Sequence, residues 1–103
     1  MEYTVDVLAS LAKVSDDELD NLLSALEQRV LGPAISFNAV RGFLEVMFTI
    51  AARTDKEATS TAIAALREAL QEVGLLTEVT VSSLHVLPVD RLGREEAAAA
   101  ILV

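Results

Sequence analysis

Few side chains in this sequence are suited to catalysis or metal binding. His85 is the only histidine and cysteine is absent, which excludes multi-histidine and thiolate metal sites and cysteine nucleophiles. The glycines each fit a turn or a helix end, and none belongs to a phosphate-binding loop. We therefore expect no cofactor and no metal. A histidine titrates near neutral pH, so His85 is a candidate acid or base, although a lone histidine is more often structural.

A second candidate is a pair of carboxylates, Asp6 and Glu45, in two segments of alternating apolar and polar residues. If these segments form adjacent strands, both carboxylates point to the same face of a sheet. Asn38 would then lie directly opposite Glu45. Two carboxylates at close range suit general acid–base catalysis or a hard cation. We favour the simpler interpretation of solvated surface charges, so Asp6, Asn38, Glu45 and His85 are candidates only.

The two helices that would position these residues are marked by their first turns. Ser15 with Glu18, and Thr54 with Glu57, have the spacing of a capping box. Apolar residues then recur at helical spacing until Gly32-Pro33 in the first case and Gly74 in the second. The predicted buried stripes are Leu19, Leu22, Leu23, Leu26 and Val30, and then Ile63, Leu66, Leu70 and Val73 with Ala62, Ala65 and Ala69 beside them.

The segment between the helices alternates between apolar and polar residues and predicts a β-hairpin that turns at Arg41-Gly42. Its apolar face would pair Ala39 with Leu44, Phe37 with Val46, and Ile35 with Phe48. The alternative is a mainly helical bundle in which residues 36–53 form a helix.

Alternation also predicts strands at each end of this unit, over residues 2–7 and 77–87. The phase of the last strand changes near Ser82-Ser83, which indicates a β-bulge. Eleven residues would make this strand longer than its neighbours, so that it overhangs the sheet and invites pairing with another chain.

The resulting order, β-α-β-β-α-β, is that of the ferredoxin-like α+β sandwich, with two helices on one face of a four-stranded antiparallel sheet. We expect one such domain over residues 1–89. Residues 90–103 form an alanine-rich C-terminal tail, predicted to be a short helix. The expected core face consists of Tyr3, Val5, Val7, Ile35, Phe37, Leu44, Val46, Phe48, Ile50, Val79 and Val81.

Composition narrows the function further. The chain is 52% apolar with a net charge of -8, which disfavours binding to nucleic acid or an anionic membrane. The acidic N-terminus does not resemble a signal peptide, so the expected compartment is the cytoplasm. We expect a homo-oligomer, with a further protein partner as a possibility. The expected contacts are Val40, Phe43 and Met47 on the uncovered sheet face, Leu84 and Val86 on the last strand, and Ile101, Leu102 and Val103 on the tail.

These features favour an oligomeric binding or assembly module that acts through protein or small-ligand contacts. The alternative is a small dimeric α+β-barrel enzyme that uses His85, or the Asp6 and Glu45 pair, as acid and base. A cavity at these residues would favour the enzyme, and a filled core with a flat sheet face would favour the module.

Overall fold

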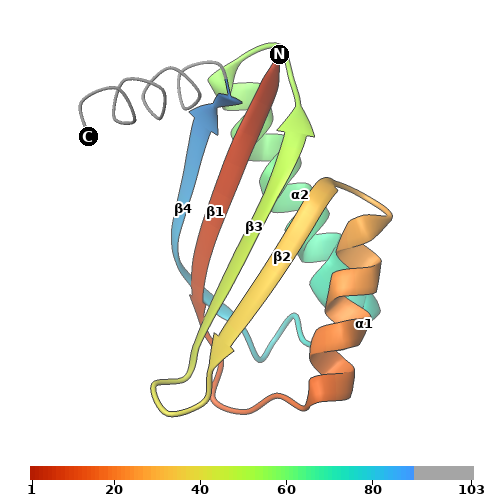
Figure 1. Ribbon diagram of the computed structural model, residues 1–103, viewed down its shortest axis with the longest axis vertical. Coiled ribbons are helices and arrows are strands. Elements are labelled where there is room, and N and C mark those ends of the chain that lie inside the picture. The colour runs from red at the N-terminus through yellow and green to blue at the C-terminus, as the bar shows by residue number, and fades with distance from the viewer. Residues whose placement is uncertain (90–103) are drawn as a thin grey trace, which may run out of the picture.

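The computed structural model describes residues 1–89 and contains the predicted order of strands and helices (Figure 1). The fold is a ferredoxin-like α+β sandwich, with an antiparallel sheet of order β2-β3-β1-β4. The helical bundle is wrong, because a hairpin joins the two helices. The predicted tail, residues 90–103, lies outside the described residues. The elements are β1 Glu2–Ser10, α1 Asp16–Glu27, β2 Leu31–Asn38, β3 Phe43–Ala51, α2 Asp55–Glu72 and β4 Thr80–Pro88.

Both helices begin at the predicted caps. The Ser15 hydroxyl accepts a hydrogen bond from the Glu18 amide at 3.1 Å, and the Glu18 carboxylate accepts one from the Ser15 amide at 3.0 Å. The Thr54 hydroxyl accepts from the Glu57 amide at 3.1 Å. These bonds satisfy amides that the helix itself leaves without partners. Of the helices in the described part of the chain, neither is long and apolar enough to span a membrane.

The core lies between the helices and the sheet, and both helices cover the same face (Figure 1). Most of the predicted core residues are buried there, and Ile35, Phe37 and Val79 pack against them while remaining partly exposed. Two predictions are wrong. Ile63 is 47% exposed, because the alanines of α2 form the side that contacts the sheet. Val81 is 46% exposed, because it lies on an edge strand just before the bulge.

The predicted hairpin exists, but its register differs by two residues. Phe37 pairs with Leu44 and Ile35 pairs with Val46. The loop is longer than expected because the Asn38 side chain accepts hydrogen bonds from the amides of Val40 and Arg41, both at 3.1 Å. An even shift leaves the side chains that remain in the strands on their predicted faces and changes only the partner across the strand.

The last strand confirms the predicted bulge and corrects the predicted overhang. Ser83 pairs with Leu8 and Val81 pairs with Ala9, so Ser82 is the extra residue. β4 contains nine residues, as β1 and β3 do, and it pairs with β1 from Tyr3 to Ser10. The residues before Thr80 form a turn instead of extending the strand, so no end of β4 overhangs the sheet.

Candidate functional site

The sheet face that the helices leave uncovered is the main candidate site, and it is called the open face below. The register assigns its residues, because side chains directly opposite each other on paired strands share a face. The open face consists of Glu2, Thr4, Asp6, Leu8 and Ser10 of β1, Phe43, Glu45, Met47, Thr49 and Ala51 of β3, Leu31, Ala34, Ser36 and Asn38 of β2, and Thr80, Ser83, His85 and Leu87 of β4.

The middle of the open face brings together two sequence candidates that lie far apart in the chain. Asp6 pairs with His85 on one side and with Met47 on the other. Directly opposed side chains on antiparallel strands have Cβ atoms about 5 Å apart. The imidazole of His85 and the Asp6 carboxylate are therefore neighbours on the open face, and the structure shows no hydrogen bond or ion pair between them. The sequence alone missed this pairing, because it depends on the register between the first and last strands.

Asp6 is unusual in its hydrogen bonding. Its Oδ1 atom is buried and has no hydrogen-bond partner among the described residues. A buried carboxylate oxygen without a donor is unfavourable, because it has lost its hydration and gained no replacement. The His85 side chain, in contrast, is exposed. The Asp6 oxygen is therefore an acceptor without a donor, and the neighbouring His85 imidazole has N–H groups that can donate.

Glu45 lies near this pair as predicted, whereas Asn38 does not lie opposite Glu45. Glu45 pairs with Leu8, so it is a diagonal neighbour of Asp6 on the open face, as expected for adjacent strands. Ser36 and not Asn38 lies opposite Glu45. Asn38 uses its side-chain oxygen to hold the hairpin loop. Asn38 is thus a structural turn residue, and the polar group on the open face consists of Asp6, Glu45 and His85.

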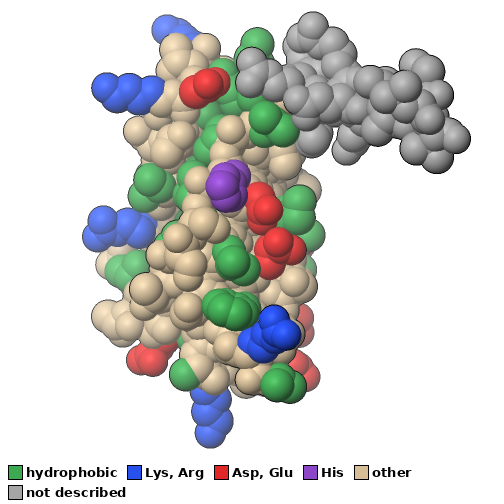
Figure 2. Space-filling model, turned by 90° about the vertical axis from the view of Figure 1, so that its left-hand side faces the viewer, with side chains coloured by type: hydrophobic (Ala, Val, Ile, Leu, Met, Phe, Trp, Pro, Cys, Tyr) green, Lys and Arg blue, Asp and Glu red, His purple; other side chains and the backbone are tan. Residues whose placement is uncertain are grey.

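Apolar side chains surround this polar group. Leu8, Phe43 and Met47 are 37%, 40% and 41% exposed, and Leu31 at the β2 edge is 59% exposed. Figure 2 shows the one histidine with acidic and hydrophobic side chains beside it on the same side of the molecule. The predicted contact residues Phe43 and Met47 therefore lie on the open face.

The other predicted contact residues lie elsewhere. Val40 is 97% exposed, but it sits at the tip of the hairpin because the longer loop removes it from the strand. Leu84 and Val86 pair with Val7 and Val5, so they point to the helix side and pack against the core. Ile101, Leu102 and Val103 are outside the described residues. Of the predicted contact residues within the described part of the chain, only Phe43 and Met47 therefore lie on the open face.

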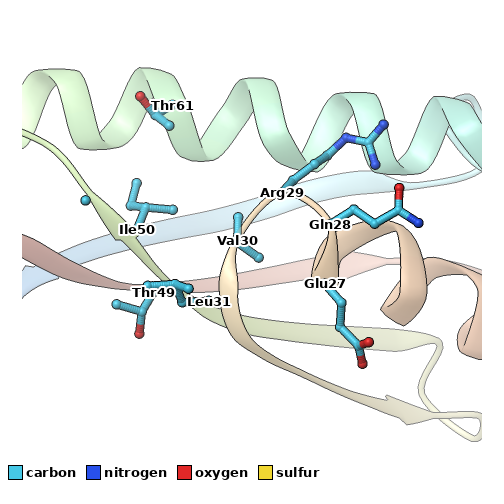
Figure 3. A pocket seen from close by; sticks show the side chains of 9 residues that line it. Glu27, Gln28, Arg29, Val30, Leu31, Thr49, Ile50 and Thr61 are labelled. Atoms are coloured by element: carbon cyan, nitrogen blue, oxygen red, sulfur yellow. The ribbon is translucent and has the colours of Figure 1, made fainter.

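Three hollows in the described part of the chain lie away from the polar group of the open face. One of about 350 Å³ opens where the end of α1 meets β3 and α2, and Figure 3 shows Glu27, Gln28 and Arg29 pointing in different directions around it. The Arg29 guanidinium is already bound, to the Ala25 carbonyl at 2.8 Å and to the Glu72 carboxylate at 3.2 Å. It also forms an ion pair with Glu68. This cavity has no converging set of free polar groups.

Two further hollows, of about 410 and 400 Å³, lie along α1 and are lined by its side chains together with Ile35 or with Glu72 and Val73. Neither hollow, nor the one beside Arg29, is lined by Asp6, Glu45 or His85. Within residues 1–89, no three histidine or carboxylate side chains are placed to hold a metal ion.

Comparisons with known proteins add little. No protein-family model and no curated protein matches the sequence. Among solved structures, a candidate antibiotic biosynthesis monooxygenase from Chloroflexus aurantiacus J-10-fl is similar at 9% identity, over 86% of this chain and 94% of its own, with a TM-score of 0.47. An uncharacterized protein from Thermotoga maritima is similar at 12% identity, over 86% of this chain and 99% of its own, with a TM-score of 0.43. Similarity at this level says nothing about the activity of this chain.

Proposed function

We propose that this protein is a small assembly module whose open face binds a second copy of the same chain. The main observation in support is that Leu8, Leu31, Phe43 and Met47 are exposed on one side of a sheet whose other side is buried. Monomeric proteins rarely expose large contiguous apolar patches, and such patches mark interaction sites. Packing two sheets face to face is a common way to cover them.

The size of the open face supports a second copy as the occupant. Four strands about 4.8 Å apart, each eight or nine residues long at about 3.3 Å per residue, span roughly 19 by 28 Å. The projected area is then roughly 500 Å², and the accessible area of side chains standing on it is larger. Stable interfaces bury about 800 Å² on each partner. One open face therefore supplies most of the surface that a symmetric dimer requires.

A symmetric dimer also suits the composition of the face. In a two-fold interface the same patch serves both subunits, so it must tolerate its own copy. Threonine and serine side chains lie among the apolar residues and can exchange hydrogen bonds across such an interface. The carboxylates of Glu2, Asp6 and Glu45 are the part of the face that repels its own copy. The side chains around the hollow beside Arg29, in contrast, point in different directions, and none of the three hollows is lined by Asp6, Glu45 or His85. A surface function is therefore better supported than a pocket function.

A second candidate function rests on the pairing of Asp6 with His85. A dimeric-barrel enzyme would enclose a cavity between two open faces, and this pair would donate and accept protons there. The two functions differ in what lies between the subunits. A structure of the dimer with a ligand-sized cavity bordered by Asp6 and His85 favours the enzyme, and a closely packed interface favours the module.

The module is tested by mass in solution. Sedimentation velocity at micromolar concentration is expected to give about 22 kDa, twice the 11.0 kDa of one chain. Leu8→Glu is expected to give a monomer, because it places a further negative charge in the apolar interface, opposite Glu45. Ile63→Glu is the matched control, since Ile63 is similarly exposed but lies on α2. A mass of one chain at every micromolar concentration, at pH 6 as well as at pH 8, contradicts the proposal.

A further inference from the structure

We propose that the assembly of two open faces takes up protons, and that the proton-binding group is His85 beside Asp6. On this basis the dimer is tighter near pH 6 than near pH 8. The inference rests on the proposed function and concerns its regulation. It is carried by three observations: the register that pairs Asp6 with His85, the Asp6 oxygen that lacks a donor, and the charges on the open face.

The first step is the geometry of the pair. His85 lies directly across from Asp6, on the edge strand β4. Protonated histidine carries N–H donors on both ring nitrogens, whereas the neutral ring has only one. Charged hydrogen bonds to a carboxylate are stronger than neutral ones. The unpartnered Oδ1 of Asp6 would therefore gain most from the protonated form of His85.

The second step is the charge of the whole face. Its acidic residues are Glu2 and Asp6 on β1 and Glu45 on β3, and β2 contributes only uncharged side chains. None of the open-face positions on the four described strands is lysine or arginine. Arg41 at the hairpin tip and Arg53 after β3 lie at opposite ends of the sheet and not in the row of Asp6. His85 is thus the only residue of the open face that can become positive.

Packing two open faces together changes the electrostatic energy of these charges. Two open faces bring the carboxylates of both copies together and remove water from between them, which strengthens their repulsion. With His85 neutral, nothing on either face offsets that repulsion. A proton on each His85 introduces one positive charge per copy beside the central Asp6. The protonated form is therefore favoured in the dimer over the separated chains.

The direction of the pH dependence follows from linkage. A state that favours the protonated form of a group gains stability as the pH falls. Histidine gains its proton as the pH falls through about 6.5. Because the dimer contains two copies of His85, its log Kd can change by up to about two decades per pH unit over the range in which the dimer holds both protons and the separated chains do not. Between pH 8 and pH 6 we expect Kd to fall by about tenfold or more.

The test measures the dimer Kd by sedimentation velocity at pH 8, 7 and 6 and at constant ionic strength, for the wild type and three variants. His85→Gln cannot be charged, so its Kd is expected to stay high, near the wild-type value at pH 8. His85→Lys is always charged, so its Kd is expected to be low at all three pH values. Asp20→Asn is the matched control: it removes a carboxylate from the exposed surface of α1 and is expected to keep the wild-type pH dependence.

The outcomes separate this inference from the function on which it rests. A dimer whose Kd does not change with pH overturns the inference and leaves the assembly module intact. A pH dependence that survives in His85→Gln also overturns it, because another group then binds the proton. A chain that stays monomeric at every pH, also as His85→Lys, overturns the assembly module itself.

Discussion

The two faces of one sheet differ sharply, although the same strands supply both. On β3, Val46 and Phe48 point to the helices and are 1% and 2% exposed, whereas Phe43 and Met47 point the other way and are 40% and 41% exposed. Adjacent residues of a strand point to opposite faces, so one residue along the chain separates a buried environment from an exposed one. The difference is produced entirely by where the two helices lie.

Hydrogen bonding shows the same contrast. On the helix-covered face, the buried side chains of the described residues are apolar except for the phenol of Tyr3. The open face contains the buried Asp6 oxygen without a donor. One face is complete within a single chain, and the other has an unmet acceptor and uncovered apolar area. A second chain can supply what the open face lacks, and this is why we assign the interface to that side.

The strongest test of this comparison is a charge placed on either face at adjacent positions. Val46→Asp puts a carboxylate into the core without a partner, which is expected to destabilise the fold by about 4 kcal/mol or more. That loss is a large share of the stability of a small domain, about 5–15 kcal/mol, so the variant should unfold at a much lower urea concentration than the wild type. Glu45→Lys, one residue away, should change the stability of the chain by only about 0.5 kcal/mol. Urea unfolding followed by circular dichroism measures both.

If Val46→Asp folds as well as Glu45→Lys, the register of β3 is wrong and the two faces are exchanged. Unfolding of both variants would mean instead that the open face is covered within the single chain. The two faces are assigned correctly only if Val46→Asp is much less stable than Glu45→Lys.

A gentler test uses the same residue type on both faces of β3. Phe48→Ala leaves a cavity in the core and is expected to lower the free energy of unfolding by about 3–5 kcal/mol. Phe43→Ala is expected to lower it by less than about 1 kcal/mol in the single chain, because Phe43 is already partly hydrated. Its larger effect should be on the dimer Kd. Equal destabilisation of the two variants in dilute solution would contradict the assignment of faces.

The sequence predicted the faces of the sheet better than it predicted the pairing of strands. Alternation assigns each residue to a face locally, so Val5, Val46 and Phe48 were placed correctly in the core. Strand partners depend on loop length, which Asn38 sets by accepting two hydrogen bonds from the loop. The observed register differs from the predicted one by two residues, so the strand residues keep their predicted faces but Ser36 and not Asn38 lies opposite Glu45. Local patterns thus specify orientation, and turn chemistry specifies register.

The pairing of Asp6 with His85 could not be predicted from local sequence patterns, because it also depends on strand register. Asp6 and His85 lie opposite each other only because β4 returns to the other edge of β1, after a bulge at Ser82. The change of phase near Ser82 was visible in the sequence and indicated the bulge. It did not specify which residue of β4 lies opposite Asp6. The buried, unpartnered Oδ1 of Asp6 depends on side-chain packing from both neighbouring strands, which alternation does not report.

The smallest expected effect concerns the titratable group on the covered face, Tyr3. Its side chain is 2% exposed. Burial first, and then a hydrogen bond to Asp55 and the negative charges of Asp55 and Glu57, raise the pKa of the Tyr3 phenol above its usual value near 10. The folded state thus favours the neutral phenol. Its contribution to stability is present below the unfolded pKa and is lost as the pH rises through the folded one.

Tyr3 is the only tyrosine and tryptophan is absent, so the alkaline ultraviolet absorbance of the protein reports this phenol alone. In the folded protein its ionisation is expected above the pH at which it occurs in urea. Wild-type stability to urea should fall from about pH 10 upward. Tyr3→Phe should lack this part of the fall, because it has no proton to lose. A phenol that titrates identically in folded and unfolded protein would show that the first strand is not covered at Tyr3, and the contrast between the two faces would then not extend to that end of the sheet.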